Sequence, residues 1–280
     1  MNNFWTRVLT GAVFLAVMII GTLVIILLPI LLLTIIILCL LEFYKILKKN
    51  NYNPQTWRGI ILGIILFILA TIQATNGSLY EFYKFLPIPV TWIISYFFLL
   101  FIIELFRNKP NPILNIALTL LGIIYIVVPI ILLYAIILDP INNLDETSHT
   151  LILLGYFILI WSNDTFAYLV GRVIGKHKLF ERISPKKTWE GTIGGLLFTQ
   201  GMAYVISIYF TELAPIHWHA IALIVSVFGT LGDLVESMFK RSLGVKDSGT
   251  ILPGHGGILD RFDGVLLSSP FVVTYLMLVR

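Results

Sequence analysis

The sequence predicts an all-α, polytopic integral membrane protein, on the evidence of its composition and its hydropathy. Hydrophobic residues occupy 58% of the 280 positions, and the mean hydropathy is +0.93. An average soluble domain has only about 45–50% apolar residues. Apolar stretches long enough to cross a bilayer recur along the whole chain, and no Ser/Gly-rich linker separates them. We therefore expect one continuous membrane domain.

Hydropathy predicts about nine transmembrane helices. The first two meet at Pro29 and could be one broken helix, whereas the fifth contains Pro129 and could be a single kinked span. With nine spans, the two termini lie on opposite sides of the membrane. The predicted spans are 8–28, 30–47, 57–75, 88–106, 112–138, 150–174, 190–210, 216–238 and 263–279.

The distribution of Lys and Arg orients these spans. Every basic residue except Lys84 and Arg280 falls on the side of the N-terminus, while the loop at 139–149 is acidic and has no Lys or Arg. Because loops that face the cytoplasm carry excess Lys and Arg, we expect a cytoplasmic N-terminus. The same excess accounts for the sequence pI of about 9.1, so no nucleic-acid partner is expected.

Two of the loops predicted to be cytoplasmic, 175–189 and 239–262, combine Gly with charged residues of both signs. Charges beside a membrane are costly, and a dense group of them indicates a functional site. We expect the two loops to build one polar catalytic cavity near the cytoplasmic side. Residues 1–110 then form N-terminal scaffold helices, and residues 111–280 form the catalytic region of the same membrane domain.

Asp164 lies near the middle of the predicted span 150–174. With Tyr168, Gly171 and Gly175 it forms a polar, small-residue face at helical spacing. Asp164 could bond a neighbouring helix or line a hydrated cavity that binds substrate, and both readings stay open.

The span at 216–238 ends with three charged residues on one face, Asp233, Glu236 and Lys240. They either neutralise one another or point at a ligand and a metal ion. Asp260 and Asp263 repeat the pattern at i, i+3. Mg²⁺ prefers a few carboxylates together with water and phosphate oxygens, so Asp233 and Asp260 are the candidate metal ligands.

Basic residues near these acids are candidates for binding phosphate. Lys186, Lys187 and Thr188 directly precede a predicted helix, and both Lys and helix N-termini favour phosphate. Gly191, Gly194 and Gly195 follow at a spacing that suits close helix packing. His255 could bond a phosphate, cap a helix or simply pack in its loop. The further basic candidates are Lys240, Arg241, Lys246 and Arg261.

Several other site classes lack their motifs. The sequence contains no Walker motif, no HExxH pair and no CxxC pair, which leaves P-loop, zincin and dithiol chemistry without support. Cys39 is the single cysteine, so no intrachain disulfide can form.

The stretch SMFKRSLGVKDSGTILPGHGGILDRFDG at 237–264 resembles the signature of the phosphatidate cytidylyltransferases, or CDP-diacylglycerol synthases. NDTFAYLVGRVIGKHKL and SPKKTWEGTIGG, upstream, are also similar to that family. The resemblance is dense over about 150–264 and rests on hydropathy alone over 1–149. The signature residues are Ser237, Lys240, Arg241, Lys246, Asp247, His255, Gly256, Gly257, Asp260, Arg261 and Asp263.

The resemblance implies that CTP and phosphatidate react to give CDP-diacylglycerol and pyrophosphate. It also implies dependence on Mg²⁺, a possible monovalent cation such as K⁺, and a possible homodimer. Carried over by motif, the metal ligands are Asp233 and Asp260, and Lys240 and Arg261 join them as catalytic residues. The expected substrate-binding residues are Asp164, Lys186, Lys187, Thr188, Glu236, Arg241, Lys246, His255 and Asp263.

Two other functions fit part of the pattern. A CTP-dependent lipid kinase would also need Mg²⁺ and basic residues, and a secondary transporter of an anionic solute would also hold charges at membrane depth. The length of the 237–263 match favours the cytidylyltransferase over the kinase. The clustering of charge at the cytoplasmic ends, away from the midplane, disfavours the transporter. The absence of a long N-terminal extension leads us to expect a bacterial plasma-membrane protein.

Overall fold

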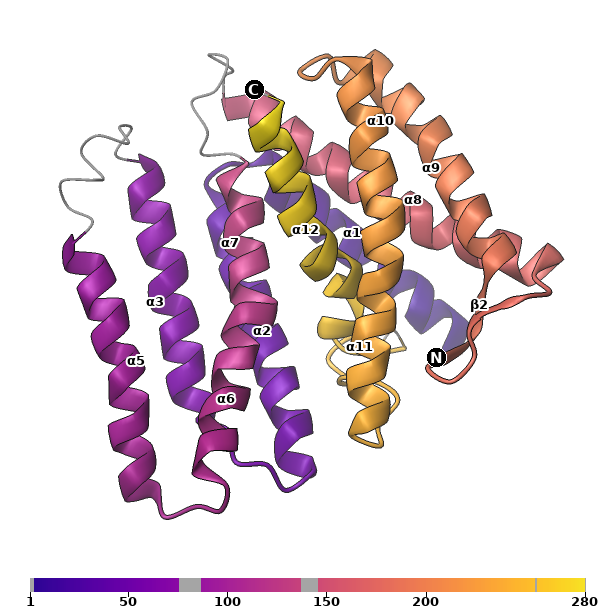
Figure 1. The fold of residues 1–280 in the computed structure, drawn as a ribbon. Coiled ribbons are helices and arrows are strands. Elements are labelled where there is room, and N and C mark those ends of the chain that lie inside the picture. Colours follow the sequence, from indigo (N-terminus) through magenta and orange to yellow (C-terminus); the bar gives the residue numbers. More distant parts are fainter. Residues whose placement is uncertain (1–2, 76–86, 137–145, 255, 280) are drawn as a thin grey trace.

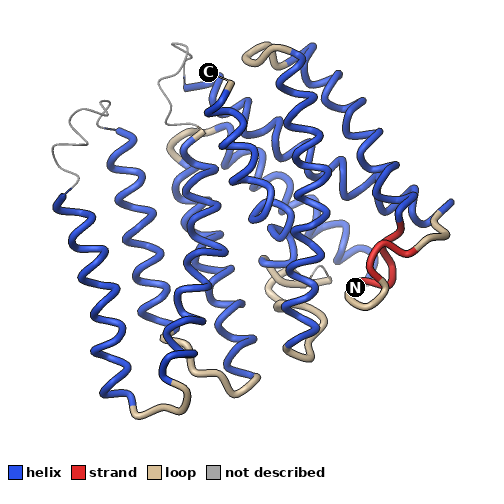
Figure 2. Tube along the Cα trace, viewed as in Figure 1, coloured by secondary structure: helices blue, strands red, loops and turns tan. Residues whose placement is uncertain are grey.

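The structure is a computed structural model that describes residues 3–75, 87–136, 146–254 and 256–279. These residues form a helical bundle with one small β-hairpin (Figures 1 and 2). The helices are α1 (Asn3–Leu23), α2 (Leu27–Lys49), α3 (Thr56–Thr75), α5 (Pro87–Arg107), α6 (Pro112–Gly122), α7 (Val128–Ala135), α8 (Glu146–Ile174), α9 (Trp189–Tyr209), α10 (Pro215–Ile224), α11 (Thr230–Ser242) and α12 (Leu259–Leu278).

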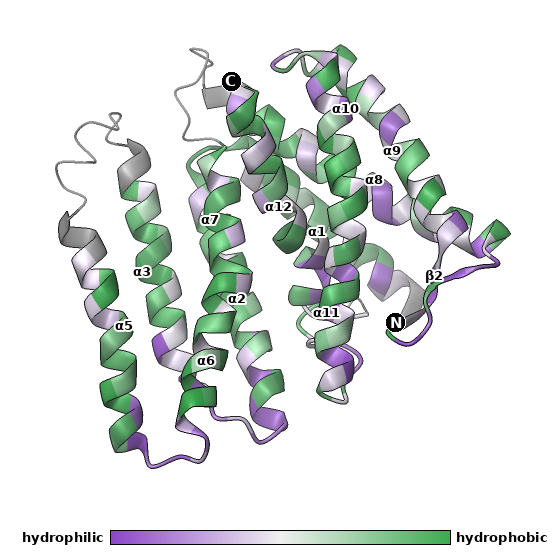
Figure 3. Cartoon of the chain, in the orientation of Figure 1, coloured by the Kyte–Doolittle hydropathy of each residue, from purple (hydrophilic) through white to green (hydrophobic). Residues whose placement is uncertain are grey.

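The helices confirm an all-α integral membrane architecture in its main features. Among the described residues, seven helices are long and apolar enough to cross a membrane, and the shorter Thr56–Ile72 is also apolar. Each of the nine predicted segments coincides with helical residues within the described ranges. Hydrophilic residues gather at the lower ends of α2, α5 and α11 and in the hairpin (Figure 3).

The two prolines that left the span count open behave differently. Pro29 lies in the first turn of α2, and α1 ends separately at Leu23, so these are two helices. Pro129, in contrast, lies in a continuous helical stretch, because α6 leads through the π-helical turn η1 (Ile123–Val127) into α7. Pro129 has no N–H to donate and its ring crowds the preceding turn, which the wider π turn relieves. The fifth predicted span is therefore one interrupted helix.

A second π-helical turn, η3 (Val225–Gly229), joins α10 to α11 into the continuous stretch Pro215–Ser242. α11 carries the charges of the predicted site. Gly232 on α11 packs so closely on α12 that an added Cβ would overlap the backbone carbonyl of Asp263. The side chains at the starts of α11 and α12 are thus held near one another.

Buried aromatic side chains pack the helices together. Tyr44 of α2 is fully buried, and its hydroxyl donates to the carbonyl of Thr119 at 2.7 Å. A Cβ at Gly59 or at Gly122 would run into the Tyr44 ring, so α3 and α6 both approach α2 closely at this point. Tyr156 of α8 bonds the Ser268 hydroxyl of α12 at 2.8 Å.

The structure confirms the bounds of the first loop predicted to be cytoplasmic to within one residue and corrects those of the second. The loop predicted at 175–189 contains an antiparallel hairpin of β1 (Lys178–Phe180) and β2 (Ser184–Thr188). The loop predicted at 239–262 shortens to residues 243–258, hereafter the final loop, because α11 runs to Ser242 and α12 begins at Leu259. Hydropathy assigned charged residues to loops, although a helix terminus accommodates them well: Asp near its start and Lys or Arg near its end.

Candidate functional site

A buried ion network joins α11 to α12. Lys240 of α11 pairs with Glu236 one turn earlier and, at 2.7 Å, with Asp260 in the first turn of α12. The side chains of these residues are 12%, 1% and 10% exposed, respectively. Lys240 therefore neutralises Glu236 on the face of α11 where the sequence predicted both residues. Because Lys240 bridges Glu236 and Asp260, the part of the 237–264 signature on α11 contacts the part on α12.

The carboxylate of Asp260 also organises the final loop. Its Oδ1 and Oδ2 both accept the backbone N–H of Ser248 at 3.1 Å, and Oδ2 accepts the N–H of Gly257 at 2.8 Å. Gly256 has φ +86°, and a Cβ there would lie 2.7 Å from the Asp260 carboxylate. Glycine at 256 thus allows the backbone to close around the acid.

The hairpin reaches the same region through Lys187. Its Nζ lies 2.7 Å from Asp233 Oδ2 of α11, and it donates to the Thr230 carbonyl at 3.3 Å. Asp233 also accepts the Ser237 hydroxyl at 3.1 Å. Because the Asp233 side chain remains 40% exposed, it is open to a ligand while Lys187 holds it.

Acids from three helices face one another around Asp233. The charges of Asp164 on α8 and Asp233 on α11 both act on Asp263 of α12, and Lys187 acts on all three. Arg261 interacts electrostatically with Asp164. The structure therefore brings together Asp164, Lys187, Asp233 and Asp263, which the sequence had placed in separate segments.

A divalent cation suits this donor set. Among the described residues, no group of three or more His, Cys, Asp and Glu side chains has the geometry to ligate one metal ion. Mg²⁺ does not need such a cage, since it binds through one or two carboxylates together with water and phosphate oxygens. Asp233 has the exposure for that role, and its acidic neighbours favour a cation. Asp260 is engaged by two N–H groups and Lys240, so a metal ion there would compete with Lys240.

Thr188 and Arg241 have local roles in the structure. Thr188 is the N-cap of α9, where its hydroxyl accepts the N–H of Gly191 at 3.2 Å. Arg241 donates to the Val245 carbonyl at 3.2 Å at the end of α11. Lys186, Lys246 and Arg261 are exposed. His255 lies outside the described residues.

The predicted close packing of α9 is confirmed. A Cβ at Gly191 would lie 2.7 Å from the Ala167 carbonyl of α8, and one at Gly195 would lie 2.9 Å from the Ala167 side chain. α8 and α9 therefore touch backbone to backbone. This contact anchors the base of the hairpin, which carries Lys187.

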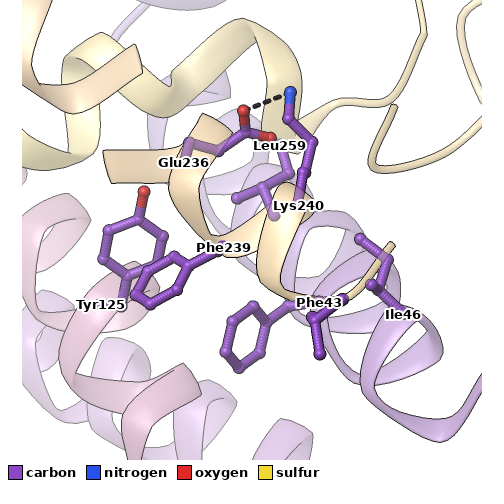
Figure 4. Close-up of a pocket in the computed structure, with 8 residues that line it drawn as sticks. Phe43, Ile46, Tyr125, Glu236, Phe239, Lys240 and Leu259 are labelled. Atoms are coloured by element: carbon purple, nitrogen blue, oxygen red, sulfur yellow. Dashed lines mark ion pairs between the residues drawn. The ribbon is translucent and has the colours of Figure 1, made fainter. Parts of the chain in front are cut away.

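Sequence reasoning missed two residues beside the network. Glu42 of α2 is 3% exposed and bonds the final loop, and Tyr125 of η1 packs edge-on against Phe239 of α11. Glu42 could have been found, since it is an acid inside the predicted span 30–47, as Asp164 is inside the span 150–174. Figure 4 shows the apolar pocket that Tyr125, Phe43 and Leu259 line beside the Glu236–Lys240 pair.

Comparisons with known proteins point to one family. The model of the family described as the cytidylyltransferase family matches residues 4–279. A protein of Staphylococcus saprophyticus named phosphatidate cytidylyltransferase is 35% identical over 76% of this chain and 89% of its own length.

Two further relatives with the same name match shorter regions. One from Staphylococcus aureus (strain COL) is 53% identical over 41% of this chain, and one from Bacillus subtilis (strain 168) is 49% identical over 49%. The matched region spans 45% of the S. aureus protein and 51% of the B. subtilis protein.

Proposed function

Because this chain belongs to the cytidylyltransferase family over nearly its whole length, we propose that it transfers the cytidylyl group of CTP to phosphatidate, giving CDP-diacylglycerol and pyrophosphate. The relatives named above carry the name of that reaction. The observation that best supports it is that Lys187 of β2 and Lys240 of α11 meet five carboxylates carried by α8, α11 and α12.

The reaction makes modest demands on the side chains. The phosphate of phosphatidate is already an anionic nucleophile, so no strong general base is needed. Catalysis then consists of holding that phosphate in line with the α-phosphorus of CTP and stabilising the charge that develops on pyrophosphate. In our proposal Lys187, Lys240 and Arg261 bind the phosphates, with further contacts from exposed Lys186 and Lys246.

We propose Mg²⁺ as the cofactor, held by Asp233 and Asp260. It would neutralise negative charge on the phosphates when bound. Asp164 and Asp263 lie beside Asp233 and strengthen the local negative potential that attracts a cation. A monovalent cation and a homodimer remain proposals that rest on the family resemblance alone.

We further propose nine spans with the site on the cytoplasmic side of a bacterial plasma membrane. The distribution of Lys and Arg supports this orientation. CTP would reach the polar end from the cytoplasm, and the lipid would arrive sideways from the bilayer. A water-soluble substrate and a lipid can meet only where both phases are accessible.

A labelling experiment tests the reaction. Purified protein is incubated with Mg²⁺, phosphatidate and CTP that carries the label on its α-phosphate, and the lipid is then extracted. We expect label in the lipid fraction. In a parallel reaction with CTP labelled on its γ-phosphate, label that enters the lipid from that position only would identify a kinase. No label from the α-phosphate in a folded preparation would overturn the proposed cytidylyl transfer.

Variants of the two proposed metal ligands test the site. We expect Asp260→Ala and Asp233→Asn each to lower kcat by at least about 100-fold, because charge stabilisation in the transition state is lost. Glu181→Ala, at an exposed acid of the hairpin turn, is the matched control and should keep its activity. Normal turnover in either Asp variant would contradict the metal assignment.

A further inference from the structure

Glu42 ties α2 to the start of α12. Its Oε2 accepts both the Ser248 hydroxyl and the backbone N–H of Leu259, each at 2.9 Å. We propose that Glu42 is a positioning residue, which holds the final loop and the first turn of α12 so that Asp260 is correctly oriented. The inference rests on the proposed function, because that function makes Asp260 catalytic.

The bond to Leu259 supplies a helix cap that the neighbouring sequence lacks. Leu259 is the first residue of α12, and the first N–H groups of a helix have no partner inside it. Ile258, at the N-cap, has no side-chain oxygen to offer. A carboxylate from α2 takes that place, and its negative charge also suits the positive end of the helix. Glu42 therefore stabilises the start of the helix that carries Asp260 and Asp263.

Ser248 links Glu42 to Asp260 directly. Its hydroxyl donates to Glu42, while its backbone N–H donates to both carboxylate oxygens of Asp260. Lys240 then bonds Asp260 from the other side. A shift of Ser248 would change the hydrogen bonds that orient Asp260. By this route, Ser248 is the single residue between Glu42 and Asp260.

The final loop is shaped to fit the Glu42 carboxylate. A Cβ at Gly249 or at Gly257 would overlap that carboxylate, so only glycine lets the loop approach it this closely. The Glu42 side chain is almost fully buried, and its Oε1 has no hydrogen-bond partner in the described part of the chain. Since both donors bond Oε2, a glutamine amide oxygen could accept both of them.

This arrangement makes the choice of substitution informative. Glu42→Gln keeps the acceptor and should retain kcat within about threefold. Glu42→Leu removes the acceptor at similar volume and should lower kcat by about 100-fold, because small misplacements of catalytic groups have effects of that size. Ser248→Ala, which breaks one of the two bonds, should fall between the two variants.

A second readout separates positioning from catalysis. Cys39, the single cysteine, is fully buried one turn before Glu42 and lies in the neighbourhood of Glu236 and Asp260. Release of the loop should expose it to a small water-soluble maleimide. In detergent-solubilised full-length protein, we expect Glu42→Leu to be labelled about tenfold faster than wild type, and Glu42→Gln at the wild-type rate.

The matched control is Glu104 on α5. It is 4% exposed and also accepts several hydrogen bonds, from Gln55, Arg107 and Asn115, but none of these partners is in the final loop. We expect Glu104→Leu to lower the Tm without a change in Cys39 labelling.

Three results would overturn the inference: wild-type kcat and labelling in Glu42→Leu, loss of activity in Glu42→Gln equal to that in Glu42→Leu, or equally fast labelling in Glu104→Leu. If wild-type protein transfers no cytidylyl group, the proposed function fails, whereas the labelling comparison still decides whether Glu42 holds the loop.

Discussion

At the scale of single residues, Lys187 is the side chain through which the hairpin meets the helices. It lies on β2, yet its Nζ contacts both the carboxylate of Asp233 and the carbonyl of Thr230 on α11. A Lys that is held toward an exposed acid is placed to bind a phosphate oxygen that approaches the same acid, and its charge limits the repulsion between them. Lys186, its neighbour, is more exposed and has no such anchor within the described part of the chain.

Lys187→Ala should lower kcat/KM by about 100-fold, because a preorganised positive charge beside the phosphates is removed. Lys176→Ala is the matched control, since Lys176 is an exposed basic residue just before the same hairpin, and it should change kcat/KM by less than about threefold. Steady-state assays with the labelled CTP measure both. Equal losses in the two variants would mean that the loop contributes only general positive charge.

Residue spacing predicted part of this site. Helical periodicity placed Glu236 and Lys240 on one face of a helix, and their ion pair confirms it. No periodicity could pair Lys187 with Asp233 or Glu42 with Ser248, because these partners lie on different elements and meet only through the packing of the bundle.

At the scale of elements, the contact between α11 and α12 determines the distance between the acidic residues of α11 and those of α12. A Cβ at Gly232 would overlap the backbone of Asp263, and a Cβ at Gly264 of α12 would meet the backbone of Gly229 of η3 at ordinary van der Waals distance. Small residues let two helix backbones come together, which is the main source of helix association where lipid surrounds the bundle. Sequence reasoning predicted this use of glycine for α9, but not for α11, whose single glycine, Gly232, is followed directly by the charged Asp233.

Gly232→Ala should therefore push α11 away from α12. The added methyl group would overlap a backbone carbonyl, which cannot swing aside as a flexible side chain could. We expect a lower Tm and a fall in kcat of about tenfold or more. Gly201→Ala on α9 is the control, because a Cβ there meets nothing within 4 Å, and its Tm should be unchanged or slightly higher. Thermal unfolding in detergent and the labelled-CTP assay measure the two effects, and a Gly232→Ala variant with wild-type Tm and kcat would contradict the tight contact.

At the scale of the whole molecule, the two termini lie toward opposite ends of the bundle, and the N-terminus lies at the end that carries the hairpin and the final loop (Figure 1). Arg7 of α1 approaches Gly254 of the final loop, which agrees with that placement. Hydropathy located the helices because burial in lipid selects for long apolar stretches. The hairpin was not predicted, because β2 consists of four polar residues and one proline and so carries no hydrophobic alternation.

The predicted orientation can be tested with two matched threonines. Thr211 lies in the connection between α9 and α10, and Thr250 lies in the final loop; both are exposed. Each is replaced by Cys in a Cys39→Ala background, and sealed right-side-out membrane vesicles are treated with a membrane-impermeant maleimide. The proposed orientation, which rests on the excess of Lys and Arg, predicts that Thr211→Cys is labelled at once and Thr250→Cys only after the vesicles are permeabilised. The reverse pattern would mean that the hairpin and the final loop face the outside of the cell, and it would contradict the proposed orientation.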